Sequence, residues 1–178
     1  MTDFEELLEQ HREGITRRWF DAAVAAYPAD GAAAFARQED PFANPVGHSL
    51  REGTRGVFRA LLEGSEPAAV SRYLHEVIRI RAVQDFSASE ALGCIFELKG
   101  AVREELADLA RDPGLAADLM RLERQIDQVA LAAFDVFVEC RERVSELRVN
   151  EMKRQVSWIV DKLNAGGADP ESVPIEGE

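Results

Sequence analysis

Residues 115–163 read LAADLMRLERQIDQVALAAFDVFVECRERVSELRVNEMKRQVSWIVDKL, and this stretch decides the fold. No proline or glycine interrupts it, and apolar side chains recur at spacings of three and four. That pattern predicts one helix, which Asn-Ala-Gly-Gly at 164–167 would end. At 1.5 Å per residue the helix would span about 70 Å, about twice the size of a globular domain of this mass. We therefore expect part of it to project or to pack on another chain.

Two heptad frames follow one another along this helix. The first supplies the residues that we predict at a dimer interface: Leu122, Ile126, Val129, Ala133, Val136 and Cys140. The second continues with Val149, Met152, Val156, Ile159 and Leu163. The frame shifts near residues 144–147, as at a coiled-coil stutter. Heptads favour a homodimer through a two-stranded or four-helix contact; the alternative is a helix folded back on its own domain.

The remainder of the chain also predicts helices, so the predicted fold class is all-α. Apolar spacing favours helices over residues 4–27, 46–62, 66–86 and 87–110, with a short one near 32–38. Local signals mark three helix ends: Gly64 as a terminating glycine, a capping box from Ser87 to Glu90, and Pro113 at a first helical position. We predict a single domain over residues 1–164 and a disordered acidic tail over 165–178, which is rich in glycine and proline.

Composition restricts the classes of function. The chain has 178 residues and a net charge of -12, which disfavours nucleic acid as a partner because phosphate backbones would be repelled. No apolar run approaches the ~18 residues that cross a bilayer, and the acidic N-terminus does not resemble a signal peptide. The two cysteines, Cys94 and Cys140, form no CxxC pair, and we expect Cys94 to be buried. These features predict a cytoplasmic protein without membrane insertion.

No catalytic or metal-binding motif is present in the sequence. The three histidines, His11, His48 and His75, contain no pair at i, i+4 and no HExxH, so we expect no metal site. A single histidine could ligate a haem from one side, but one histidine on a helix does not by itself define a haem site. We therefore expect neither an enzyme nor a cofactor.

Two short stretches stand out as candidate sites. In the first, residues 40–48, Asp40 and Asn44 can bond backbone amides beside His48. This stretch is either an ordered turn or the mouth of a small-ligand pocket. In the second, residues 79–86, Arg79 and Arg81 lie near a helix C-terminus with Asp85. These arginines stabilise the helix dipole, or pair with Asp85 or Asp40, or hold an anionic ligand.

Four stretches resemble the RsbRD-type N-terminal domain family, the sensor domain of stressosome co-antagonists and sensor histidine kinases. They are DPFANPVGH at 40–48, YLHEVIRIRAVQDFS at 73–87, AAFD at 132–135 and RVNE at 148–151. The resemblance, to a stand-alone version of these domains, implies a non-haem, globin-like helical bundle that dimerises through its last helix. It also implies a sensory or regulatory role, and it brings no catalytic residues.

The function that we predict is therefore a non-enzymatic sensor or signalling scaffold. Binding of a ligand or partner would be transmitted through a dimeric C-terminal helix, because two packings close in energy are what such a switch needs. A second copy of the chain and a separate output protein are the expected partners. The alternative is a globin-like binding protein for a haem or a small apolar or anionic ligand.

Overall fold

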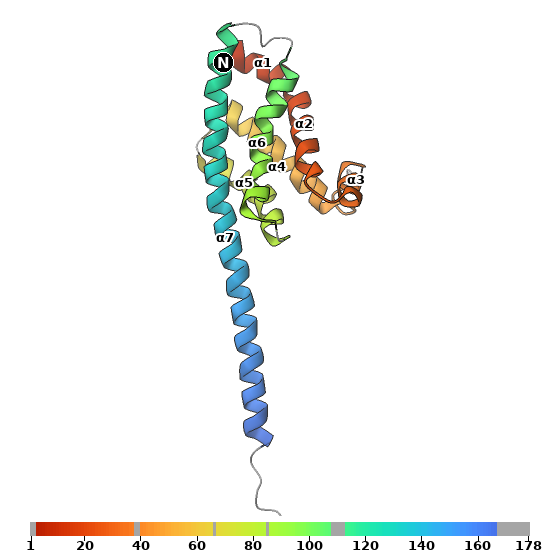
Figure 1. Ribbon diagram of the computed structural model, residues 1–178, viewed down its shortest axis with the longest axis vertical. Coiled ribbons are helices and arrows are strands. Elements are labelled where there is room, and N and C mark those ends of the chain that lie inside the picture. Colours follow the sequence, from red (N-terminus) through yellow and green to blue (C-terminus); the bar gives the residue numbers. More distant parts are fainter. Residues whose placement is uncertain (1–2, 38–39, 66, 85, 108–112, 167–178) are drawn as a thin grey trace, which may run out of the picture. The chain divides into compact units, whose positions relative to one another are not determined.

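The computed structural model describes residues 3–37, 40–65, 67–84, 86–107 and 113–166. Within these ranges the chain forms seven helices and no strand (Figure 1). The helices are α1 (Asp3–Gln10), α2 (Arg12–Ala25), α3 (Ala29–Arg37), α4 (Pro45–Leu62), α5 (Pro67–Val83), α6 (Ala88–Glu105) and α7 (Pro113–Gly166). The all-α prediction is confirmed, including the long last helix.

The chain divides into two compact units, Met1–Cys140 and Arg141–Glu178. Residues 113–140 of α7 belong to the first unit and residues 141–166 to the second. The sequence predicted one domain over 1–164, so the boundary after Cys140 is a difference from that prediction. Most of the predicted acidic tail, from residue 167 onward, lies outside the described residues.

One predicted helix is two helices in the structure. The helix expected over 4–27 is interrupted at His11, whose backbone (φ -96°, ψ 5°) leaves the helical region between α1 and α2. Leu8 and Ile15, on either side of the interruption, are both buried. They lie seven residues apart, which is two helical turns, so the apolar pattern matches that of a continuous helix. The sequence pattern therefore could not reveal the interruption.

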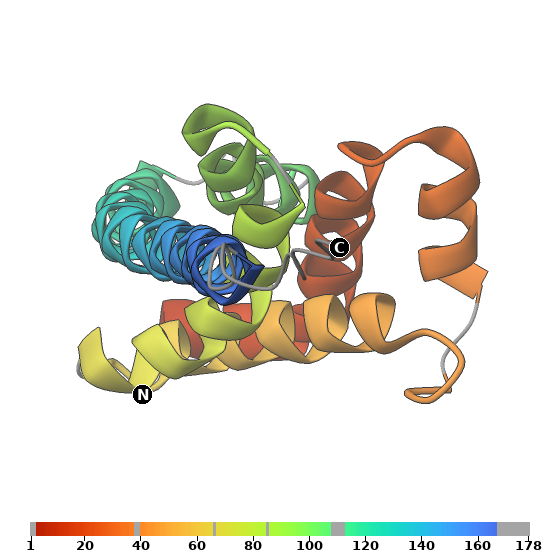
Figure 2. The same cartoon turned by 90° about the horizontal axis from the view of Figure 1, so that it is seen from below.

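The first unit is built on two helix pairs, α4 with α5 and α2 with α6. In Figure 2, α5 crosses α4, and α3 lies near the N-terminal end of α4. Two glycines of α4, Gly53 and Gly56, face α5. A Cβ added at Gly56 would come within 3.0 Å of the Tyr73 ring, and one at Gly53 would meet Val77 at a similar separation. The absence of side chains at these two positions therefore sets how closely α4 and α5 approach.

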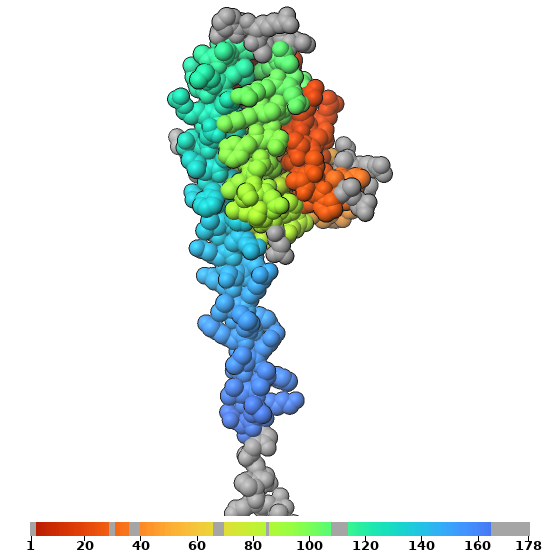
Figure 3. All heavy atoms as spheres, viewed as in Figure 1, coloured from red at the N-terminus to blue at the C-terminus, as the bar shows by residue number. Residues whose placement is uncertain are grey.

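Residues 113–140 of α7 complete the core of the first unit. Figure 3 shows α6 between α2 and this part of α7. Two ion pairs join α6 to α7: Lys99 Nζ lies 2.6 Å from Asp127 Oδ1, and Arg103 Nη2 lies 2.7 Å from Glu123 Oε1. The apolar face of this segment is buried within the single chain, so this half of the helix packs on its own domain.

That packing corrects the predicted dimer interface. Five of its six residues are core residues of one chain: Leu122, Ile126, Val129, Ala133 and Val136. The sixth, Cys140, is half-buried against the same core. An apolar stripe must be buried, but the sequence does not specify whether the same chain or a second chain buries it. Here the first half of α7 packs on its own domain, as the folded-back alternative predicted.

The predicted helix ends are confirmed. Gly64, at φ 57°, follows α4, and the amides of Gly64 and Ser65 donate to the carbonyls of Leu61 and Ala60. This is the Schellman arrangement that glycine permits. Ser87 and Glu90 form the full capping box of α6, and α7 begins at Pro113.

Candidate functional site

Asn44 has a structural role in the turn before α4. Its Oδ1 accepts from the Gly47 amide at 2.8 Å, which caps the helix. Its Nδ2 donates to the Phe35 carbonyl at 3.1 Å, which ties the turn to α3. Asn44 is buried. The structure therefore supports the ordered-turn interpretation of this residue.

The other two candidates in this turn, Asp40 and His48, make local hydrogen bonds. Asp40 is exposed, and its Oδ1 accepts from the Phe42 amide at 2.9 Å within the turn. His48 is half-buried in the first turn of α4, where its amide donates to the Asn44 carbonyl. Neither lines the groove described below.

Arg81 is fully buried, and it caps a helix other than its own. Its Nη2 donates to the Ala23 carbonyl at 2.5 Å, in the last turn of α2, and its Nη1 donates to the Glu90 carbonyl at 3.2 Å. Its guanidinium also lies 5.2 Å from the ring centroids of Tyr27 and Phe86. A cation beside the free carbonyls of a helix C-terminus is stabilising. Arg81 thus joins α2, α5 and α6.

The surroundings of Arg81 perturb two neighbouring groups. Burial raises the pKa of the Tyr27 phenol, and the charge of Arg81 acts in the opposite direction. Burial also raises the pKa of the Cys94 thiol, which donates to the Ala91 carbonyl. The expected burial of Cys94 is confirmed, and both groups are neutral at physiological pH.

The remaining two candidates of this stretch do not join Arg81. Arg79 is exposed on the opposite side of α5, and Asp85 lies outside the described residues. The stretch 79–86 therefore contributes one buried capping arginine, and the three predicted residues do not form a shared site among the residues that the structure describes.

Two histidines lie beside glutamates. His11 Nδ1 is 3.4 Å from Glu105 Oε1, and His75 Nε2 is 3.9 Å from Glu139 Oε2. Arg18 also donates to Glu105, at 2.8 Å, and this hydrogen bond lowers the pKa of the Glu105 carboxyl. Across the described ranges, no three histidine, cysteine, aspartate or glutamate residues gather as a metal site.

A row of apolar side chains on the second half of α7 is exposed. Within residues 141–166 these side chains are 40–70% exposed and follow the second heptad frame: Val149, Met152, Val156, Ile159 and Leu163. On residues 113–140 other apolar side chains are exposed, away from the core-facing side: Met120, Leu131, Phe134 and Val138. The apolar residues open to a partner are thus not those predicted from the first frame.

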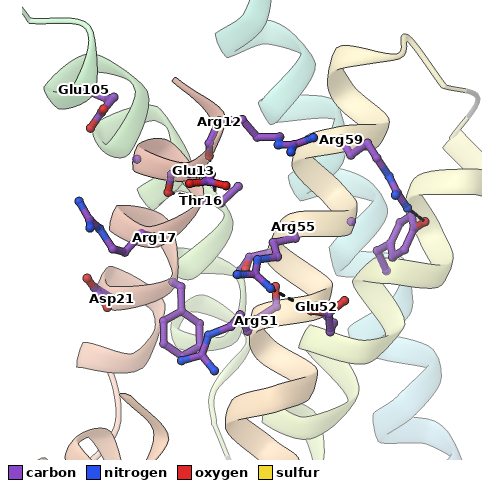
Figure 4. A pocket seen from close by; sticks show the side chains of 15 residues that line it. Arg12, Glu13, Thr16, Arg17, Asp21, Arg51, Glu52, Arg55, Arg59 and Glu105 are labelled. Atoms are coloured by element: carbon purple, nitrogen blue, oxygen red, sulfur yellow. Dashed lines mark hydrogen bonds and ion pairs between the residues drawn. The ribbon is translucent and has the colours of Figure 1, made fainter. Parts of the chain in front are cut away.

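The sequence reasoning missed a groove between α2 and α4. It encloses about 950 Å³, and Arg51, Arg55 and Arg59 of α4 line it (Figure 4). These arginines stand at i, i+4 and i+8, so a signal was present in the sequence. The closeness of α2, which makes the row into a groove, was not visible there.

The described residues are all-α, with an arginine-lined groove in the first unit and an exposed apolar face on residues 141–166. Residues 13–152 match the family model of the RsbT co-antagonist protein rsbRD N-terminal domain. The match spans well over half of the 178 residues, and the chain belongs to this family. It is a family of sensory and regulatory domains and not of enzymes.

The resemblance predicted from the motifs is thereby confirmed. No curated protein and no solved structure matches the chain, so the globin-like arrangement stays a prediction. Among the described helices, none has both the length and the apolar character needed to cross a membrane.

Proposed function

We propose that this chain is a non-enzymatic sensory module that forms a homodimer through α7 and passes a binding event along that helix. The observation that carries the proposal is the exposed stripe of the second heptad frame: Val149, Met152, Val156, Ile159 and Leu163. Alternating spacings of four and three place these side chains along one seam, which a second helix can cover. Membership of a regulatory family supports the role.

The stripe is sufficient for a weak association. Fully burying an aliphatic side chain gives about 1.5–3 kcal/mol, and about half of each side chain is still exposed in one chain. Five residues from each of two chains then contribute about 10 kcal/mol. Association costs about 4–15 kcal/mol in lost freedom. We therefore expect a dimer whose population depends on protein concentration.

Charges beside the stripe set the salt dependence of this dimer. Arg148, Lys153 and Lys162 occupy the positions that flank a seam through Val149, Met152 and Leu163. In a parallel pair of helices Arg148 of one chain would face Lys153 of the other, and salt screens such repulsion. The dimer dissociation constant should therefore fall as ionic strength rises. A dissociation constant that increases with salt would contradict this arrangement of the two helices.

Sedimentation equilibrium of the full chain tests the dimer. Val156→Asp places a charge in the seam and should shift the protein to monomer. Trp158→Asp is the matched control, because Trp158 is equally exposed but stands two residues away, outside the seam. A wild-type protein that stays monomeric at high micromolar concentration would refute the dimer. Equal dissociation by both variants would refute the seam.

A fusion tests transmission along α7. The full domain is placed before a histidine-kinase catalytic module, with four or seven residues inserted after Leu163. Seven residues preserve the heptad phase and four shift it. Kinase activity should respond to the four-residue insertion and not to the seven-residue one. Identical activity in both fusions would show that α7 does not transmit a packing change.

A further inference from the structure

The groove between α2 and α4 carries a row of positive charge. Arg51, Arg55 and Arg59 follow one another at intervals of four residues along α4, so they share one face of that helix. Successive members are about 6 Å apart along the helix axis. Figure 4 shows these three side chains on the α4 side of the opening and Glu13 on the α2 side.

This row is costly for the protein on its own. Like charges at i, i+4 destabilise a helix by about 0.2–0.5 kcal/mol per pair. The chain has 33 acidic and 21 basic residues, so carboxylate partners are abundant. Other arginines use them: Arg18 pairs with Glu105 and Arg103 pairs with Glu123.

In the groove, aromatic rings hold the arginines instead. The Arg51 guanidinium lies 4.5 Å from the centroid of the Phe20 ring. Arg59 Nη2 donates to the Tyr73 hydroxyl at 2.8 Å, and Arg72 of α5 donates to the same oxygen. For the part of the chain that the structure describes, no carboxylate lies within ion-pair distance of Arg51, Arg59 or Arg72. The rings orient these cations, and Glu63 and Glu52 act on Arg59 only by attraction at longer range than an ion pair.

Tyr73 is itself held in place. Its ring carbons pack against the α4 backbone at Gly56, where no side chain intervenes. Its single hydroxyl therefore brings two guanidinium groups together at a fixed point on the surface. The two hydrogen bonds, from Arg72 and then Arg59, lower the pKa of the Tyr73 phenol.

Arginines slightly outnumber carboxylates in the lining of the groove, with Arg12, Arg17, Arg51, Arg55 and Arg59 against Glu13, Asp21, Glu52 and Glu105. Among the described residues, Glu13 and Asp21 of α2 form no ion pair with the α4 row. Glu52 lies 3.2 Å from Arg55, but both side chains are more than half exposed, and such a pair contributes little. Glu105 is already bonded to Arg18 and His11. The α4 side of the groove thus keeps a surplus of guanidinium donors that face an open space of ligand size.

We infer that this groove binds a multivalent phosphate anion, with Arg51, Arg55 and Arg59 as the phosphate ligands. A guanidinium fork matches the oxygens of a phosphate group bidentately. A row that spans about 12 Å along α4 requires at least two phosphate groups. Because the whole chain carries a net charge of -12, binding comes from these local contacts and not from long-range attraction. The inference does not depend on association through α7.

The chemistry is shared by inorganic polyphosphates and nucleoside polyphosphates. The Phe20 and Tyr73 rings already carry guanidinium groups, so a nucleobase finds no free aromatic face. Tripolyphosphate and adenosine triphosphate should therefore bind with similar affinity. Adenosine triphosphate that binds much more tightly would assign the natural ligand to the nucleotides, and it would add a base contact to the same arginine row.

Isothermal titration of the full chain with tripolyphosphate tests the site, with sulfate at matched ionic strength as reference. Arg55→Gln and Arg59→Gln should each raise the dissociation constant about tenfold, the loss of one charge-assisted contact. Arg79→Gln is the matched control, because Arg79 is exposed and lies outside the groove. This variant should leave the dissociation constant unchanged. Absence of saturable binding, or equal weakening by Arg79→Gln, would overturn the inference.

A second readout follows the tyrosines. Bound phosphate would neutralise Arg59, one of the two arginines that lower the pKa of Tyr73, so that pKa should rise when tripolyphosphate is added. Tyr73→Phe should abolish this change in the absorbance titration and leave the buried Tyr27 signal. An unchanged Tyr73 titration at saturating tripolyphosphate would place the ligand elsewhere and overturn the assignment to this groove.

Discussion

Alanine at Gly56 should destabilise the protein, whereas alanine at Gly93 should stabilise it. Both glycines lie inside helices, α4 and α6 respectively. Alanine removes a helix-propensity penalty of about 1 kcal/mol at either position. The two sites differ in their surroundings, because a Cβ at Gly93 meets nothing within 4 Å. The pair therefore separates packing from propensity.

The packing contribution at Gly56 follows from the atoms that the new methyl group would meet. These are Cδ1, Cε1 and Cγ of the Tyr73 ring, within 3.0 Å of an ideal Cβ. Cγ lies near the base of the side chain, so a small rotation of the ring cannot relieve the overlap. Overpacking of this kind costs about 1–3 kcal/mol. Gly56→Ala should then unfold about 1–3 kcal/mol more easily than Gly93→Ala.

Urea unfolding of both variants, monitored by circular dichroism, measures this difference. A gain of 1 kcal/mol also corresponds to about 2–4 °C in Tm for a chain of this length. Tyr73→Ala should partly rescue the Gly56 variant, because it removes the obstructing ring. If Gly56→Ala stabilises the protein as much as Gly93→Ala, the close approach of α4 and α5 at this point is wrong.

Three further outcomes follow from the structure. Asn44→Ala should lower the free energy of unfolding by about 1–3 kcal/mol, because it removes an N-cap and leaves buried groups unpaired; urea denaturation beside the exposed Asp40→Ala control measures this. Glu105 has a lowered pKa in the fold, so its stabilisation is complete above the ordinary glutamate pKa of about 4.3 and is lost as the pH falls below it. The free energy of unfolding of Glu105→Gln should therefore be lower than that of wild type at neutral pH and should approach it in acid, which urea unfolding at several pH values would show. Finally, a thiol reagent should label Cys140 in the native protein and reach the buried Cys94 only after unfolding, which mass spectrometry of the labelled protein can follow.

The helices were predictable because their signals are local. Apolar spacing, a capping serine and a terminating glycine each act within a few residues, and α4 and α7 begin and end close to their predicted limits. The helix α6 begins as predicted but ends at Glu105, five residues before the predicted limit. The interruption at His11 was not predictable, because the apolar period continues across it. The boundary between the two units inside α7 also leaves no proline or glycine to mark it.

The sites were harder to predict because each depends on a neighbour far away in sequence. Leu122 and Ile126 present an apolar face that a second chain could cover as well as the same chain does. Arg81 was expected to stabilise its own helix, to pair with Asp85 or Asp40, or to hold an anion, but it donates to a carbonyl 58 residues earlier. Arg51 belongs to a groove only because Phe20 of α2 lies beneath it.

The position of Arg81 bears on how long the folded domain lasts. Its guanidinium bonds two carbonyls on different helices, one 58 and the other 9 residues away. These bonds require α2, α5 and α6 to be assembled, so we expect them to be absent from the folding transition state. Interactions absent from the transition state slow unfolding and leave the folding rate nearly unchanged. Arg81→Ala should therefore raise the unfolding rate constant in stopped-flow measurements and leave the refolding rate constant nearly unchanged. The buried arginine would then contribute to the kinetic stability of the native state.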